Sequence, residues 1–355
     1  MFKLKLKIIV SLKLLIICIL IFLKIFKNKK KKIGVIGLSH CNNIGNNLLK
    51  YAINIKLSEL GFEPYIIGFY QKSSDITFIN KTTNLRIIHK SFKEIKRNDY
   101  DILMVNSDQT WRPDKHNKFF YDIGFLCFAK SWNIPKFVYA ASLGIDYWSF
   151  SKDDEKIAKE CLRNFSGISL REKGSIKFVK KHLDIKANYA LDPTLLIDKK
   201  YYFNIINNYK PKNMKNDNFI LIYKFLNETN TNRFIKIASK QLGYHIYNVR
   251  SKDKNSIEKF IYGVIKCKAV ITNSFHGTVF SIIFNKPFVS FIFLNSPRER
   301  LDSLKKLFNI GNRIFEYNQF PDVNLLTTPL NINTKIMNSL KIHSINFLKK
   351  NLGIK

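Results

Sequence analysis

Apolar and polar positions alternate along the chain in a pattern that predicts strands and amphipathic helices in turn. Residues 32–38 form a short apolar, β-prone run that ends at a Gly37 turn, and residues 46–60 place apolar side chains at helical spacing before Gly61. A further apolar run, at residues 64–69, predicts the next strand. A strand–helix–strand opening of this kind predicts a parallel, doubly wound sheet.

The same alternation continues beyond this opening and divides the chain. Residues 199–218 are rich in Asn, Lys and Tyr and contain Pro211, which indicates an interdomain linker. On either side we expect α/β domains, at residues 32–198 and 219–330, and a final helix within residues 331–355 that could pack on either of them. Within these domains, further strands are predicted at residues 102–105, 136–140, 167–170, 189–191, 219–225 and 244–249, and further helices at 154–165, 175–181, 233–242 and 256–265.

The first 31 residues follow a different pattern. Residues 8–26 are apolar apart from Ser11, Lys13 and Lys24, and nineteen helical residues would span about 28 Å, close to the hydrocarbon thickness of a bilayer. The segment runs into lysines and not into the small residues of a signal-peptide cleavage site. We therefore predict a basic-flanked membrane anchor at residues 1–31, spanning the bilayer or lying in its interface, with a cleaved signal peptide as the alternative. Five lysines follow the apolar segment and three precede it, which favours a cytoplasmic catalytic domain.

Composition adds two constraints. Of the 355 residues, 46% are hydrophobic, enough for buried cores, and the formal net charge is +34. An excess of this size favours anionic partners such as phosphates, acidic lipids or acidic glycans, whereas the lack of zinc-finger, RNA-recognition and helix-turn-helix signatures argues against nucleic acid. The five cysteines form no C-x-x-C pair and no Cys/His cluster with zinc spacing, so we expect reduced core thiols and no metal site.

The turn after the predicted strand at residues 265–271 carries the strongest chemical signal. A buried helix is predicted at residues 278–284 and another strand at 288–292, so the turn lies at the carboxyl end of a parallel sheet, where α/β proteins bind ligands. His276 lies in this turn and could act as an acid or a base near neutral pH. The alternative is a structural histidine whose ring is satisfied by the backbone.

Five segments distributed along the chain carry motifs. They are residues 37–48 (GLSHCNNIGNNL), 105–111 (VNSDQTW), 138–144 (VYAASLG), 168–173 with 191–194 (ISLREK and LDPT), and 274–277 with 297–304 (SFHG and PRERLDSL). In this order they resemble the polysaccharide pyruvyl transferase family, over residues 32–315. The resemblance implies two Rossmann-like domains facing a cleft, in the manner of GT-B glycosyltransferases. It also implies a metal-independent transfer from phosphoenolpyruvate to a sugar, which forms a pyruvate ketal and releases phosphate.

This chemistry requires an acid for C3 of the donor, a cation for its carboxylate and phosphate, and backbone donors at a helix start. His276 is the candidate acid, although the same position suits a phosphate ligand. Arg171 is the candidate anion clamp, with a structural ion pair to Glu172 or another acid as the alternative. Some branches of the family have Arg where this chain has Ser274, which could donate only one hydrogen bond, so that lysines or helix amides must supply the rest.

The other candidate residues lie at the ends of predicted strands. Asp108 could act as a base or bind acceptor hydroxyls together with Gln109, or both could simply cap the next turn. Asn106 replaces the family's usual glycine, and Asn tolerates positive φ. Trp111 could stack on a sugar face or lie in the core, and Asp192 is expected to shape a turn. The remaining substrate-binding candidates are Asn42, Asn43 and Gly45 in the first loop, Tyr139 and Ser142 at a strand end, and Gly277 beside Ser274.

Together these features predict a membrane-associated pyruvyl transferase with phosphoenolpyruvate as donor and no further cofactor. Its acceptor is expected to be a sugar of a surface polysaccharide or of a lipid-linked precursor. Two other functions stay open. One is a GT-B-like glycosyltransferase that uses a nucleotide sugar, and the other is a non-catalytic, membrane-bound glycan-binding protein.

Overall fold

The structure, a computed structural model, describes residues 30–38, 43–69, 76–113, 119–209, 211, 218–224, 229–293 and 298–354. Almost all of the predicted membrane anchor therefore lies outside the described residues, and so does Asn42 of the first loop. Among the residues that are described, no helix is both long enough and apolar enough to cross a bilayer.

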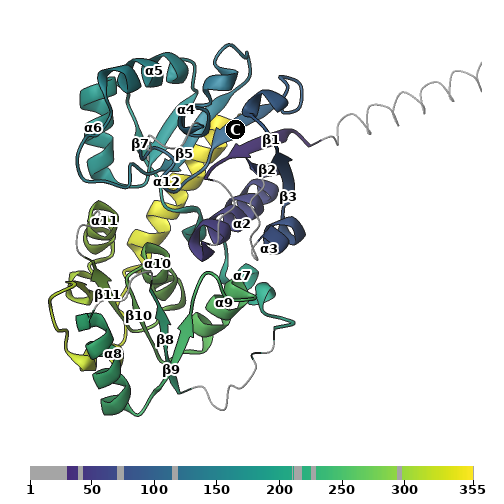
Figure 1. Ribbon diagram of the computed structural model, residues 1–355. Coiled ribbons are helices and arrows are strands. Elements are labelled where there is room, and N and C mark those ends of the chain that lie inside the picture. The colour runs from purple at the N-terminus through teal and green to yellow at the C-terminus, as the bar shows by residue number, and fades with distance from the viewer. Residues whose placement is uncertain are drawn as a thin grey trace, which may run out of the picture.

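Seven parallel strands form the sheet of the N-terminal half (Figure 1). Strand β1 lies between β2 and β4, so the strand order reverses there, and doubly wound sheets bind ligands at such a reversal, outside the carboxyl ends of the strands. In the order β3-β2-β1-β4-β5-β6-β7, the strands are Asn84–Ile88, Glu63–Phe69, Lys32–Ile36, Ile102–Val105, Lys136–Ala141, Gly167–Leu170 and Asn188–Tyr189. The α-helices between them are α2 (Ile44–Glu59), α3 (Ile76–Thr82), α4 (Phe120–Phe125), α5 (Lys152–Leu162) and α6 (Lys173–Leu183).

Five parallel strands form the second sheet, below the first in Figure 1. In the order β12-β11-β10-β8-β9, they are Ile314–Glu316, Phe288–Ile292, Ala269–Thr272, Phe219–Tyr223 and His245–Val249. The α-helices of this half are α8 (Thr229–Leu242), α9 (Ser256–Lys266), α10 (Phe275–Phe284) and α11 (Glu299–Phe308). The predicted α/β fold with parallel sheets is confirmed.

The segment predicted as a linker contains a helix, α7 (Lys199–Ile205), which its composition did not suggest. Asp198 caps α7 by accepting a hydrogen bond from the backbone N–H of Lys200 at 2.8 Å. The helix is held by Tyr202, which is fully buried, packs edge-on against Phe280 at 5.0 Å between ring centroids, and donates its hydroxyl to the Thr194 carbonyl. A tertiary anchor of this kind overrides a polar local sequence.

The last helix, α12 (Thr334–Leu352), returns from the second sheet to the first (Figure 1). Phe347 packs against Phe137 and Tyr139 of β5, with ring centroids 6.4 and 6.3 Å apart. The Ser344 hydroxyl accepts the backbone N–H of Leu191 at 3.0 Å. The sequence left open which of the two domains this helix packs on, and the structure shows that its C-terminal part packs on the N-terminal domain.

One continuous hydrophobic core joins the two halves of the molecule. It contains Leu48 of α2, Leu191 after β7, Phe280 of α10 and Leu348 of α12. Burial of each Leu or Phe side chain contributes about 1.5–3 kcal/mol, so the shared core fixes how the carboxyl ends of the two sheets face each other.

The cysteines differ from the prediction of reduced core thiols. Cys127 and Cys161 form a disulfide, with Cα atoms 5.2 Å apart, between the end of α5 and the short 3-10 helix Cys127–Ala129. Their separation of 34 residues carried no signal of pairing, because the contact depends on α4 packing against α5. Cys267 is a buried free thiol, and burial raises its pKa to about 12.

Candidate functional site

Polar side chains from both sheets meet where the carboxyl ends of the strands face each other. Asp108 follows β4, Arg171 follows β6 and Asp192 follows β7, while His276 lies in the first turn of α10, after β10. Nη1 of Arg171 lies 2.6 Å from Oδ2 of Asp192, and Nε2 of His276 lies 3.7 Å from the same oxygen. The three residues predicted to be catalytic, from three separate motifs, therefore share one cluster.

Arg171 is surrounded by carboxylates. Beyond its contact with Asp192, Nε donates to Oε1 of Glu172 at 3.0 Å, and Nη2 lies 3.6 Å from Oδ1 of Asp108. The Arg171 and Asp192 side chains are only 3% and 1% exposed, so these charges interact in a medium where little water screens them. The alternative left open by the sequence, an ion pair with Glu172, is present, and two further acids extend it.

The electrostatics of the cluster keep most of it charged. Burial would lower the pKa of Arg171, but Glu172, Asp192 and Asp108 together raise it above the ordinary value. Burial opposes ionisation of Asp192 and Asp108, yet the neighbouring cations hold the pKa of each below its ordinary value, that of Asp192 well below. Burial raises the pKa of Glu172, and Arg171 offsets only part of that rise. Asp192 and Asp108 are therefore the firmly ionised partners.

Sequence reasoning missed a second guanidinium at this site. Arg300, in the first turn of α11, lies with its guanidinium carbon 5.9 Å from the ring centroid of Phe275, and that of Arg171 lies 4.1 Å from the same centroid. Glu299 positions α11 by accepting the backbone N–H of Gly174 at 2.9 Å, across the domain boundary. Arg300 lay within a family-like segment, which was its only signal in the sequence.

His276, from the second half of the chain, lies between α2 and the Asp192 turn, which both belong to the first half. It is 6% exposed, and its Nε2 has no hydrogen-bond partner among the described residues. Its other ring nitrogen packs against Gly45, where an added Cβ would lie only 2.0 Å from Nδ1. Gly45, in the first turn of α2, thus leaves the imidazole the room it occupies, and Nε2 of the ring faces Asp192.

The start of α2 also contributes to the cluster. Asn43 caps the helix by accepting the backbone N–H of Asn46 at 3.0 Å. The Asn46 side chain, which sequence reasoning did not single out, donates to Oδ2 of Asp108 at 3.1 Å. Asn43 therefore fixes where α2 begins, and Asn46 is the residue that contacts the cluster directly, through Asp108.

Asp108 has a backbone φ of 79°, which is costly for a residue other than glycine. Its carbonyl accepts the N–H groups of both Thr110 and Ser142, at 2.7 and 2.8 Å, and these bonds hold the conformation. The sequence suggested positive φ at Asn106, two residues too early. The conformation directs the Asp108 carboxylate to Arg171 and leaves Gln109 at the rim, against Gly144.

Several predicted binding residues turn inward instead. The Tyr139 hydroxyl donates to the Leu191 carbonyl at 2.9 Å, and Ser142 accepts the backbone N–H of Gly144. Ser274 caps α10 by accepting the backbone N–H of Gly277, and a Cβ on Gly277 would lie 2.2 Å from Oγ1 of Thr272. These four residues shape the walls of the site. Trp111 is also in the core, with its indole N–H donating to the Gly124 carbonyl.

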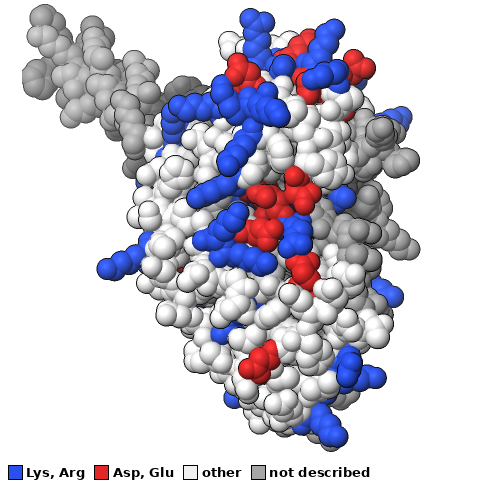
Figure 2. Space-filling model, turned by 90° about the vertical axis from the view of Figure 1, so that its left-hand side faces the viewer, with Lys and Arg blue, Asp and Glu red and all other residues white. Residues whose placement is uncertain are grey.

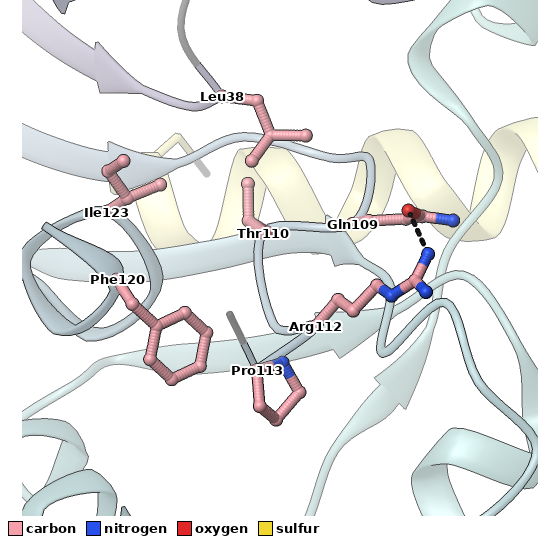
Figure 3. A pocket seen from close by; sticks show the side chains of 7 residues that line it. All are labelled: Leu38, Gln109, Thr110, Arg112, Pro113, Phe120 and Ile123. Carbon is pink, nitrogen blue, oxygen red and sulfur yellow. Dashed lines mark hydrogen bonds between the residues drawn. The ribbon is translucent and has the colours of Figure 1, made fainter. Parts of the chain in front are cut away.

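A cavity of about 420 Å³ opens beside Gln109 (Figure 3). Gln109, Thr110 and Arg112 form its polar side, with Nη1 of Arg112 donating to Oε1 of Gln109 at 3.3 Å. The apolar side consists of Leu38, Pro113, Phe120 and Ile123. Cavities of this size and mixed lining hold small polar ligands.

Figure 2 views the face that includes α6 and α11. Lys and Arg side chains gather over its upper and middle parts, and acidic side chains lie beside them at mid-height. In and around α11, Arg298 pairs with Glu316 at 2.5 Å and Lys305 pairs with Asp302 at 3.4 Å. The excess of basic over acidic residues gives a field that favours the approach of anions. In the described part of the chain, no three His, Cys, Asp or Glu side chains gather as metal ligands would.

Comparison with known proteins supports the architecture. The chain aligns with the UDP complex of MnaA from S. aureus over 92% of its length and 98% of that chain, with a TM-score of 0.56 and 12% identity. It also aligns with a UDP-N-acetylglucosamine 2-epimerase from Rickettsia bellii (TM-score 0.53, 10% identity, 92% and 97% coverage) and a putative one from Listeria monocytogenes (0.54, 11%, 90% and 95%). These likenesses show a GT-B-like fold alone.

At the level of sequence, no curated protein matches the chain. The model of the polysaccharide pyruvyl transferase family, however, matches residues 43–292. That span contains Asp108, Arg171, Asp192 and His276. The chain therefore belongs to the polysaccharide pyruvyl transferase family.

Proposed function

We propose that this transferase moves a pyruvyl unit from phosphoenolpyruvate to two hydroxyls of a sugar, in a surface polysaccharide or its lipid-linked precursor. The observation that carries the proposal is the position of His276, buried between Gly45 and Asp192 with an unpartnered Nε2. Buried imidazoles without a hydrogen-bond partner are rare unless a ligand supplies one. Membership of the family supports the donor.

The reaction can be balanced with the groups present. His276 delivers a proton to C3 of phosphoenolpyruvate, which leaves an oxocarbenium-like centre at C2. One acceptor hydroxyl forms a bond to C2, the C2–O bond to phosphate breaks, and the second hydroxyl closes the ketal. Of the two hydroxyl protons, one restores His276 and the other leaves with phosphate. General acid catalysis of this kind contributes about 10²–10⁴-fold to a rate.

The carboxylates have different roles in this proposal. Asp192 provides the counter-charge for the imidazolium form of His276, at 3.7 Å. The lowered pKa of Asp108, which burial opposes and Arg171 brings about, makes this carboxylate a weak base. We therefore assign Asp108 to orienting Arg171 and the acceptor, and not to proton removal.

The test is to incubate the full-length protein with phosphoenolpyruvate and glycan acceptors, following phosphate release and the ketal methyl signal by NMR. Acceptor-dependent release of phosphate with a new methyl signal is expected. Binding of a nucleotide sugar without binding of phosphoenolpyruvate would make the protein a glycosyltransferase. Unchanged cellular glycan pyruvylation in a His276→Ala strain would favour a non-catalytic, glycan-binding role.

We also propose that residues 1–31 attach the protein to a membrane, with the catalytic part in the cytoplasm. The support is the apolar run at residues 8–26 with lysines on both sides. Carbonate extraction of membranes should leave the protein in the pellet. Recovery of the whole protein in the soluble fraction would contradict the proposal.

A further inference from the structure

Gln109 lies between two guanidinium groups from different domains. Its amide oxygen accepts a hydrogen bond from Nη1 of Arg112 at 3.3 Å (Figure 3). With the amide turned over, the oxygen instead accepts from Nη2, Nη1 and Nε of Arg300, at 3.1, 3.2 and 3.3 Å. Arg112 follows β4 in the first domain, and Arg300 belongs to α11 in the second.

One amide cannot satisfy both arginines. Its oxygen accepts from one guanidinium while its NH₂ group faces the donors of the other. Within the described part of the chain, neither Arg112 nor Arg300 forms an ion pair with a carboxylate, in contrast to Arg171. The arrangement therefore lacks an acceptor, and a ligand anion has the two or more oxygens needed to serve both arginines.

The local field favours the same ligand. Burial lowers the pKa of Arg300 to about 10, and crowding by the like charges of Arg171 and Arg112 adds to this lowering. Asp108 and Glu172 offset this crowding only in part. An anion placed between Arg112 and Arg300 would relieve the repulsion. A cavity lined in part by Gln109, Arg112 and Phe120 lies beside two of the three side chains involved.

We propose that Arg112, Gln109 and Arg300 form a two-arginine site for a phosphate or carboxylate group, built from both domains. Its identification with an anionic group of phosphoenolpyruvate rests on the proposed function, whereas anion binding itself does not. In this chain Arg300 supplies the cation that Ser274 cannot. Arg171, held by three carboxylates, keeps the cluster folded.

The test uses the full-length protein and three probes, inorganic phosphate, pyruvate and phosphoenolpyruvate, with calorimetry and thermal unfolding. Arg112→Gln and Arg300→Gln should each weaken phosphate binding about tenfold or more, the effect of losing a charge-assisted hydrogen bond. Gln109→Glu places a carboxylate between the two arginines, so it should raise Tm and abolish phosphate binding. Lys156→Gln, which removes an exposed charge from α5, is the matched control and should bind phosphate like the wild type.

Arg112 is exposed, so its replacement should leave the fold intact even if Arg300→Gln does not. Two results would overturn the proposed anion site. One is equal phosphate affinity in the wild type, Arg112→Gln and Lys156→Gln. The other is a Gln109→Glu protein that still binds phosphate. Tighter binding of phosphate than of pyruvate assigns the site to the phosphate end of the donor, and the reverse assigns it to the carboxylate end. A protein that binds phosphate here but forms no ketal would refute the proposed function and leave the anion site standing.

Discussion

Arg171 and Arg300 contact the same aromatic ring, that of Phe275, but their surroundings differ. Arg171 is 3% exposed and faces the carboxylates of Glu172, Asp192 and Asp108. Arg300 is only partly buried, and it gains a hydrogen-bond acceptor among the described residues only when the Gln109 amide is turned over. A guanidinium ringed by acids has its charge compensated within the protein. A guanidinium whose only polar partner is a neutral amide keeps its charge for a ligand.

The contrast between the two arginines can be tested first at Arg171, where the largest effect on stability is expected. Arg171→Met leaves three buried carboxylates without their cation, and removal of one partner from a buried ion pair costs about 3–5 kcal/mol. Urea unfolding at neutral pH measures this loss.

The matched control is Arg298→Met, which breaks a half-exposed pair with Glu316 and should cost at most about 1 kcal/mol. Similar losses for the two variants would mean that Arg171 is not a structural cation. Loss of donor affinity in an Arg171→Met protein of unchanged stability would restore it as the anion clamp.

The next effect is catalytic. His276→Gln keeps a polar side chain of similar size but removes the proton donor, so turnover should fall by about 10²-fold or more while phosphoenolpyruvate affinity changes little. Steady-state phosphate release and calorimetry separate the two quantities. His343→Gln, at an exposed position of α12, is the control. A variant of His276 that loses donor affinity with turnover preserved would make this histidine a phosphate ligand.

These residues show how far sequence reasoning reaches. Asp108, Arg171 and His276 were singled out in separate motifs, and the rule that ligands bind at the carboxyl ends of parallel strands explains why the structure brings them together. The same rule could not exclude Tyr139 from the site, although this residue of β5 turns its hydroxyl inward to the Leu191 carbonyl. In a sheet covered on both faces, alternation does not tell which side of a strand end faces the ligand.

Contacts between segments that are distant in the sequence could not be predicted from it. Asp192 was expected to shape a turn, and it does so by accepting the N–H and hydroxyl of Thr194, a local signal. Its bond to Arg171, 21 residues away, depends on how β6 and β7 pair. The role of Arg300 depends on where α11 docks, which Glu299 and Gly174 decide across the domain boundary.

A smaller effect is expected where the first turn of α2 touches His276. Gly45→Ala would place a Cβ 2.0 Å from Nδ1 of His276, and overpacking of this kind costs about 1–3 kcal/mol. Turnover should fall as well, because the imidazole must shift from Asp192. Gly311→Ala, where an added Cβ meets nothing within 4 Å, should leave stability and turnover unchanged. If Gly45→Ala is equally silent, the imidazole does not need its present position.

The smallest effect should come from Asp108→Asn, because Glu172 and Asp192 still face Arg171. The change removes the charged acceptor of the Asn46 hydrogen bond, so about 1 kcal/mol should be lost at neutral pH. Because the folded-state pKa of Asp108 lies below its unfolded value of about 3.9, the contribution of this carboxylate is present above that value and disappears as pH falls through the folded pKa. Urea unfolding at pH 7, 5, 4 and 3 should therefore show the wild type and Asp108→Asn converging only at the acidic end. A difference that stays constant down to pH 3 would assign the loss to packing, and Asp108 would then no longer belong with the charges that compensate Arg171.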